Sequence, residues 1–449
     1  MSAERARSRT LAPASDPRAT SVWRGVRHDG PGGHGSGPYT GKPGLATIGR
    51  HTVLGLVCAV AVALSNPRTA AAAPATATAN LEIAYLTQAV RREPPFPYLD
   101  APPADEGIQG ARLGIADNNT TGQFTGQSFA LKELVVPEGG DVDAAFRQIA
   151  EGGLRLVVTD LPGPTLTRIA ALPEAAPVTL LNAGASDDEL RGALCRPNVL
   201  HTIPSRAMLA DALVQYLVFK RWRNILLAVG PDEDDRAFAA AVERAAQKFQ
   251  ARIVASKPWT FQPGARRTDT GHFAIEAEVA RFSQGISYDV LVVADYRDAF
   301  GDYLSYRTFD PRPVAGTQGM VPTAWARPFE QWGATQLQNR FLRQAHRWMT
   351  DRDYAAWMAV RAIGEAATRT NSVDPAAVAQ FMRGDKFDLA AFKGAKLSFR
   401  PWDGQLRQPV LLADDRSLIS VSPQPGFLHQ FSELDTLGID QPESKCRMK

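Results

Sequence analysis

The feature that most constrains the fold is a regular alternation of apolar strands and amphipathic helices that begins near residue 80. Strand-like runs such as LEIAYLT (81–87), SFALKELVV (128–136) and PVTLL (177–181) are separated by stretches with apolar residues at helical spacing. Continuous apolar strands are typical of parallel sheets that are covered on both faces. The repeated strand–helix unit therefore predicts an α/β fold with a mostly parallel sheet.

The alternation restarts after CRPNVLHTIPSR (195–206) and predicts a second sheet. A helical stripe runs from Met208 to Leu217, and later strand-like runs include NILLAVG (224–230) and YDVLVVAD (288–295). Each half has the size of an ordinary domain. We therefore expect two Rossmann-like lobes with parallel central sheets.

The last third of the chain is expected to return to both lobes. Helical stripes between residues 337 and 370 have no strands of their own, so we place them on the first sheet. KLSFRPWDGQLRQPVLLAD (396–414) predicts a hairpin that turns at Asp403 and Gly404, and we place it in the second lobe. Several chain crossings would then join the lobes as a hinge. The expected division is residues 80–200 with 323–395 in lobe 1, and residues 201–322 with 396–449 in lobe 2.

The N-terminal region is expected to contribute no part of either lobe. Residues 1–51 are rich in Arg, Gly, Ser and Pro and show no apolar period, which predicts disorder. Residues 52–77 combine a basic flank, an apolar run too short to span a membrane, and trailing small residues. This pattern is typical of a secretory signal cleaved near Ala72 to Ala77, and the alternative is an uncleaved N-terminal anchor.

Export changes the interpretation of the charge and of the cysteines. The whole chain carries a net charge of +3, but residues 1–77 carry +6, so the exported part carries −3. Without a cationic field, nucleic acid is not expected as a partner. The exported part keeps Cys195 and Cys446, which in an oxidising compartment predict a disulfide that pins the tail. Two unrelated thiols are the alternative.

The usual signatures of catalysis and metal binding are missing from the sequence. There is no G-x-S-x-G elbow, no P-loop, no G-x-G-x-x-G after a strand and no HExxH pair, and the histidines of the exported part are far apart. The acidic run Asp232 to Asp235 is typical of a solvated helix start, with acid–base catalysis as the alternative. We therefore expect no enzyme, no cofactor and no metal site.

Polar or small residues recur where the expected strands end. Such ends follow the strands at Thr159 and Asp160, Asn182 to Ser186, Gly230 to Glu233, Ala294 to Tyr296, and Gly316 to Gly319. In open α/β sheets, ligands bind beyond the carboxyl ends of the strands. Each end alone is equally well explained as a turn. Together they predict a cleft that holds a small polar ligand by hydrogen bonds, with Glu233 among the contacts.

The order of elements and three motifs resemble the type I periplasmic solute-binding proteins of ABC importers, of the branched-chain amino acid receptor type. The motifs are CRPNVLHTIPSRAMLADAL, YAAWMAVRAIGEAATRT and LSFRPWDGQL. More closely, PSRAMLADALVQYLVFKRW, WGATQLQNRF, FKGAKLSFRPWDGQLRQP and GFLHQ resemble a subgroup associated with pyrroloquinoline quinone-dependent alcohol catabolism.

This resemblance implies roles for particular residues. Thr159 and Asp160 match a loop that holds a ligand carboxylate in the family, although Asp160 would repel a carboxylate if it faced the cleft. Asn182, Ala183 and Ala185 lie in NAGAS, which matches a second such loop, with the two alanines as backbone contacts. Tyr296 stands where an aromatic residue covers the ligand. Gln318 stands where an acidic residue pairs with the ligand's ammonium, and an amide cannot neutralise that charge.

The resemblance also implies a function. It implies an exported, periplasmic and monomeric protein that captures a small polar solute by hinge closure and delivers it to the membrane permease of an ABC importer. The solute would be a small alcohol, its oxidation product or the quinone itself. The alternative is a periplasmic ligand sensor that presents its closed form to a membrane signalling protein.

Overall fold

A computed structural model of the protein describes residues 79–90, 102–260 and 277–448. All of them belong to one compact unit, residues 72–449. The expected disordered extension (1–51) and secretory signal (52–77) lie outside the described residues. Among the helices of the described part, we find none with the length and hydropathy of a membrane span.

The first lobe is built on a five-stranded parallel sheet in the order β2-β1-β3-β4-β5. Along β1, Leu81, Ile83 and Tyr85 enter one hydrophobic core, whereas Ala84 and Leu86 enter the core on the opposite face. This alternation is the two-residue period of a strand buried on both sides. The strands are β1 (Ala79–Gln88), β2 (Gln127–Val136), β3 (Leu156–Asp160), β4 (Thr179–Asn182) and β5 (Val199–His201).

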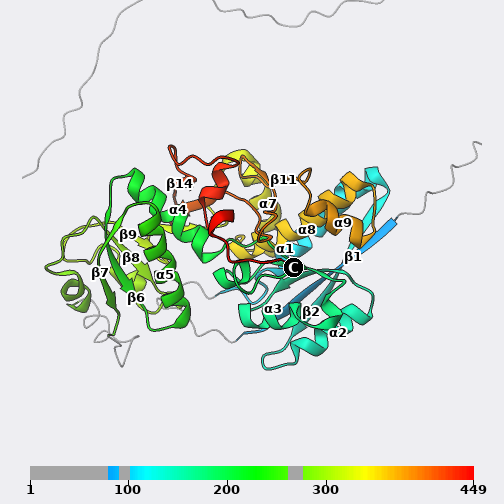
Figure 1. Cartoon of the computed structure of the whole chain (residues 1–449), viewed down its shortest axis with the longest axis horizontal. Coiled ribbons are helices and arrows are strands. Elements are labelled where there is room, and N and C mark those ends of the chain that lie inside the picture. Colours follow the sequence, from blue (N-terminus) through cyan, green and yellow to red (C-terminus); the bar gives the residue numbers. More distant parts are fainter. Residues whose placement is uncertain (1–78, 91–101, 261–276, 449) are drawn as a thin grey trace, which may run out of the picture. The chain divides into compact units, whose positions relative to one another are not determined.

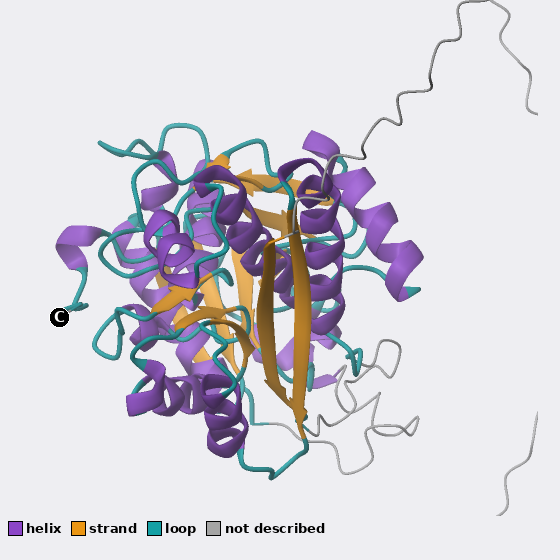
Figure 2. Ribbon diagram, turned by 90° about the vertical axis from the view of Figure 1, so that its right-hand side faces the viewer, coloured by secondary structure: helices purple, strands orange, loops and turns teal. Residues whose placement is uncertain are grey.

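Helices cover both faces of this sheet, as Figures 1 and 2 show. Trp357 of α8 is 1% exposed and belongs to the core that α1 and α8 form over one face, and Phe146 of α2 is fully buried in the core over the other. The segments between residues 337 and 370 thus lie on the first sheet. The helices are α1 (Ile108–Thr125), α7 (Ala334–Ala345), α8 (Asp351–Thr370) and α9 (Pro375–Met382) on the first face, and α2 (Val142–Glu151) and α3 (Gly163–Ala170) on the second.

The second lobe has a four-stranded parallel sheet in the order β7-β6-β8-β9. Its elements are α4 (Arg206–Phe219), β6 (Asn224–Val229), α5 (Glu233–Lys248), β7 (Arg252–Pro258), β8 (Val290–Ala294) and β9 (Val314–Gly316). Helices α4 and α5 share one core with this sheet. On the opposite face, Trp259 stacks on Phe300 at 4.7 Å between ring centroids. Helical residues 277–283 contribute Val279 and Phe282 to this second core. Two parallel sheets with helices on both faces confirm the predicted fold class.

Short antiparallel strands complete the connections between the two lobes. The predicted hairpin turns where expected, since the Gly404 N–H donates to the Arg400 carbonyl at 3.0 Å. Its arms then diverge: Gln405 bridges to His201 of the first sheet, whereas β13 (Val410–Ala413) pairs with β10 (Val321–Thr323) and β14 (Leu418–Ser422). A separate two-stranded sheet is formed by β11 (Leu389–Ala390) and β12 (Lys396–Leu397).

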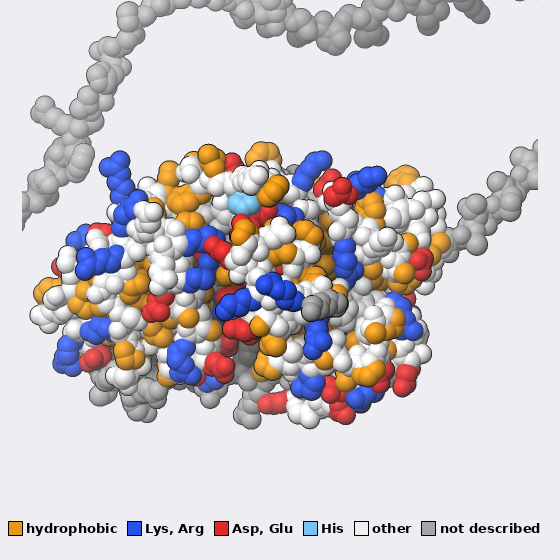
Figure 3. Space-filling model, viewed as in Figure 1, with side chains coloured by type: hydrophobic (Ala, Val, Ile, Leu, Met, Phe, Trp, Pro, Cys, Tyr) orange, Lys and Arg blue, Asp and Glu red, His pale blue; other side chains and the backbone are white. Residues whose placement is uncertain are grey.

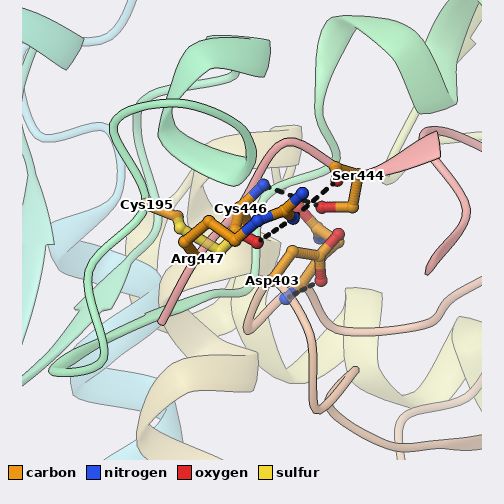
Figure 4. Close-up of a disulfide and its surroundings, with 6 residues drawn as sticks. Cys195, Asp403, Ser444, Cys446 and Arg447 are labelled. Atoms are coloured by element: carbon orange, nitrogen blue, oxygen red, sulfur yellow. Dashed lines mark hydrogen bonds between the residues drawn. A yellow bond between two sulfur atoms is a disulfide. The ribbon is translucent and has the colours of Figure 1, made fainter. Parts of the chain in front are cut away.

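The C-terminal tail contacts both lobes. Cys446 forms a disulfide with Cys195, which lies in the loop before β5 of the first lobe, and their Cα atoms are 5.6 Å apart (Figure 4). Upstream, Lys248 of the second-lobe helix α5 donates to the carbonyls of Thr436 and Gly438 at 3.0 and 2.9 Å. The tail therefore adds a covalently anchored link to the chain crossings between the lobes.

On the face of the molecule drawn in Figure 3, hydrophobic side chains are scattered among acidic and basic ones. Contiguous apolar patches are the usual sign of a permanent protein interface. The described residues on this face show no such patch.

Candidate functional site

A cavity with a volume of about 1530 Å³ lies between the lobes. One wall comes from the first lobe: the loop after β4, the segment before α1 and the start of α8. The other wall comes from the second lobe: the start of α5 and the segments after β8 and β9. This arrangement places the carboxyl ends of strands from both sheets around one cavity, as expected for ligand binding in open α/β sheets.

The first-lobe wall is organised by a buried carboxylate at the start of α8. Asp353 forms a capping box with Thr350, the residue that caps the helix. The same carboxylate accepts a hydrogen bond from the Gly107 N–H at 2.8 Å and from the Arg347 guanidinium at 2.5 Å. Asp353 thus joins the start of α8 to the segment before α1, although the two are far apart in the sequence.

Arg352 of this wall forms an ion pair with the buried Asp160. Arg352 donates to the Asp160 carboxylate at 3.1 Å and lies 3.9 Å from Glu106. The Tyr85 hydroxyl donates to the same Asp160 carboxylate at 3.4 Å. Burial lowers the pKa of the Arg352 guanidinium, but the charges of Asp160, Glu106 and Asp351 outweigh burial and raise it. Arg352 is therefore a permanent cation whose side chain is 38% exposed at the cavity wall.

The second-lobe wall centres on Tyr296. The residue is 41% exposed, and its ring meets the Phe238 ring edge-to-face at 5.8 Å between centroids. Its backbone N–H donates to Asp235 at 2.7 Å, which fixes the loop after β8 to the start of α5. The Arg206 guanidinium lies 6.0 Å from the ring centroid. Tyr296 is thus a supported aromatic surface that faces the cavity.

Arg206 also links the two walls. Its guanidinium pairs with Asp187, in the first-lobe loop after β4, at 3.2 Å and with Asp234 at the start of second-lobe helix α5. Arg206 itself opens α4, directly after the crossing from β5. Any separation of the lobes at this point would have to break one of these two ion pairs.

Two of the eight residues predicted to bind ligand line this cavity. They are Glu233, at the start of α5, and Tyr296. The other six are Thr159, Asp160, Asn182, Ala183, Ala185 and Gln318, and they are not among the described residues that form the lining.

Local hydrogen bonding explains the position of the first-lobe residues. Asn182 is fully buried, and its side-chain oxygen accepts from the Gly184 and Ala185 N–H groups at 3.2 and 2.9 Å. The Ala183 N–H donates to the Thr159 carbonyl at 2.9 Å. The N–H groups of both alanines are therefore occupied, and it is Gly184 and Ser186 of this loop that reach the cavity.

Gln318 and Asp160 are held in the same way. The Gln318 amide donates to the Asp295 carbonyl at 2.7 Å and to the Asp298 carboxylate at 2.6 Å, and its side chain is 4% exposed. Asp160 is 7% exposed and is directed at Arg352 rather than at a ligand. We expected Asp160 to repel a ligand carboxylate if it faced the cleft. The positive charge of Arg352 offsets this repulsion.

Sequence reasoning missed the cavity residues between Trp325 and Arg352. Trp325, Arg327, Trp348, Asp351 and Arg352 all line the cavity, and Arg327 lies over the Trp348 ring at 4.2 Å from its centroid. The sequence T-D-R-D (350–353) has the pattern of a capping box, and from it the start of a helix at this wall could have been predicted. Within the described ranges, no group of three or more His, Cys, Asp or Glu side chains could hold a metal ion.

Comparison with known proteins finds similarity at the level of structure. No family model matches the sequence, and no curated protein matches it. A branched-chain amino acid ABC transporter periplasmic ligand-binding protein from Burkholderia xenovorans superposes with a TM-score of 0.63 at 15% identity, over 82% of this chain and 99% of that one. A leucine-, isoleucine-, valine-, threonine- and alanine-binding protein from Brucella ovis, in a closed conformation, gives 0.61 at 15% identity over 82% and 99%.

The chain has the type I periplasmic binding protein fold. A third solved structure with this fold is the solute-binding protein of an ABC transporter from R. palustris in complex with benzoate, with a TM-score of 0.58 at 11% identity over 82% of this chain and all of that one. Identities this low establish a shared architecture and not a shared ligand. In the type I periplasmic binding protein fold of this chain, the cavity described above is the space between the two lobes.

Proposed function

We propose that the protein is the exported solute-binding component of an ABC importer, and that it holds a small polar solute in the cavity between its lobes. The observation that carries the proposal is the cavity itself, whose walls come from the strand ends of both lobes and include the exposed ring of Tyr296. A solute that touches both walls stabilises the closed form by its differential affinity for that form. Periplasmic location, a monomeric state and a membrane permease as partner belong to this proposal.

Several observations support binding rather than turnover. The described cavity wall offers carboxylates, guanidinium groups, hydroxyls and aromatic rings, and three of its carboxylates, Glu106, Asp232 and Asp234, lie within ion-pair distance of arginines. The structurally similar proteins are ligand-binding proteins, and those from Burkholderia xenovorans and R. palustris belong to ABC transporters. A link to quinone-dependent alcohol oxidation rests on the sequence resemblance alone and extends the proposal to alcohols, their oxidation products and the quinone.

Replacement of Tyr296 by alanine tests the site. The variant should fold normally, because the residue is 41% exposed, and it should bind a solute found by thermal-shift screening about 10- to 100-fold more weakly, as expected for an aromatic contact residue. Titration calorimetry on the purified exported form measures the loss. Tyr306→Ala, which removes a fully exposed tyrosine outside the cavity lining, is the matched control. Equal affinity of both variants for the solute would remove Tyr296 from the site.

A further inference from the structure

Asp351 is a carboxylate of the first-lobe wall that makes no ion pair with any described residue. It occupies the first position of α8 and lines the cavity. Its carboxylate accepts a hydrogen bond from the Arg352 backbone N–H at 2.8 Å. Within the described part of the chain, no Lys, Arg or His nitrogen lies within ion-pair distance of it.

The neighbouring acids are matched by arginines. Asp353 receives the Arg347 guanidinium, and Asp160 receives Arg352, whose Nε also lies 3.9 Å from Glu106. Both arginines are therefore already paired with other carboxylates. A half-buried carboxylate without a counter-ion is costly, because burial removes water that would otherwise stabilise the charge.

The surroundings of Asp351 hold this charge in an unfavourable environment. Burial, followed by the charge of Glu106, raises the pKa of Asp351 to about 6, although Arg352 acts in the opposite direction. Asp353 also faces it from the same helix. The charge of Asp351 also acts on Tyr296 of the second-lobe wall and on Lys393, whose ammonium donates to Gln408 and to the Pro409 carbonyl.

The rest of the cavity favours the same sign of ligand charge. Nine of the described lining residues carry carboxylates and five carry guanidinium groups, so these described residues together attract cations more than anions. The lining also includes the aromatic rings of Tyr296, Trp325 and Trp348. Aromatic faces attract cations, and two of these rings already lie near arginines.

We infer that Asp351 is the specificity-determining residue of the cavity, and that the solute is an organic amine whose ammonium group pairs with this carboxylate while Tyr296 contacts it from the other lobe. The inference rests on the proposed solute-binding function and adds a ligand class to it. An amine would supply an ion-pair partner that the described residues do not give Asp351. A carboxylate ligand would meet an unneutralised negative charge at the same position.

Matched probes that differ only in charge test the inference. We would titrate the purified exported form with benzylamine, benzyl alcohol and benzoate, and with butylamine, 1-butanol and butyrate, by calorimetry at pH 7.5. The amine of at least one series should bind at least tenfold more tightly than its alcohol and its acid. Asp351→Asn keeps the shape and the helix start, and should weaken amine binding at least tenfold. Asp385→Asn, which changes an exposed carboxylate outside the cavity, should leave it unchanged.

The pH dependence supplies a second readout. Amine binding to the unmodified protein should strengthen as pH rises through about 6, because Asp351 ionises there, and this dependence should be lost in Asp351→Asn. Thermal unfolding of the variant establishes that it remains folded. If an alcohol or an acid binds best and Asp351→Asn binds it as well as the unmodified protein does, the amine inference is overturned while the solute-binding function stands. If no amine binds, and a wider screen finds no solute at all, both are overturned.

Discussion

Replacement of Asp353 by alanine should destabilise the protein by about 3–5 kcal/mol, the usual cost of removing one partner from a buried ion pair. The carboxylate is fully buried and accepts hydrogen bonds from Gly107, Arg347 and Thr350. Alanine would leave the Arg347 guanidinium and the Gly107 N–H without this acceptor and would remove the capping box of α8. Urea unfolding of the purified exported form, followed by circular dichroism, measures the change.

The same substitution should also impair the site, because Asp353 joins the two segments that carry Glu106, Asp351 and Arg352 on the cavity wall. Asp385→Ala, at an exposed position, is the control and should change the free energy of unfolding by less than about 0.5 kcal/mol. Equal stabilities of the Asp353 and Asp385 variants would contradict the role assigned to Asp353.

Replacement of Asp435 by alanine should cost about 3–5 kcal/mol for the same reason. Asp435 is 1% exposed and accepts from Arg400 at 2.8 Å and from Arg407 at 2.8 and 2.9 Å. Arg400 is itself 2% exposed, so its charge would remain buried without its closest carboxylate. The tail would lose its ionic attachment to the hairpin that contacts β5.

Glu433→Ala provides the comparison for Asp435. It lies in the same short helical turn (Glu433–Thr436) but is exposed, and its removal should be nearly neutral. Both variants should be measured with the Cys195–Cys446 disulfide intact, since the disulfide holds the same tail. A loss of less than about 1 kcal/mol in Asp435→Ala would show that the buried pair is replaceable there.

The fold could be predicted from the sequence because its strands are long enough to show their pattern. β1, β2, β6 and β8 are apolar runs flanked by helical periods, and each was found at its predicted position. The short strands β5 and β10 have three residues each and were not predicted, because so few residues show no repetition. β9 is equally short, but the strand that ends at Gly316 was predicted, since the polar and small residues Gly316 to Gly319 follow it.

The candidate site was predicted only in part, because polar residues at strand ends have two uses. Tyr296 and Glu233 reach the cavity, but Asn182 and Gln318 satisfy the backbone and side chains of their own loops. Nothing in a single sequence distinguishes a polar side chain that binds a ligand from one that stabilises a turn. Arg352 lines the cavity but was not predicted. It pairs with Asp160, which lies 192 residues away in the sequence, and a local sequence pattern does not report such a contact.

The distance between the lobes, with and without solute, tests the central claim most directly. Glu151 of α2 and Glu243 of α5 are both exposed and can be replaced by cysteines that carry nitroxide labels. Pulsed electron paramagnetic resonance would then measure the distance between the labels, with the native disulfide intact. We predict that a solute identified by calorimetry shifts the distance distribution towards a single shorter distance, and that Tyr296→Ala needs more solute for the same shift. A solute that binds in the cavity and leaves the distribution unchanged would contradict capture by closure of the two lobes.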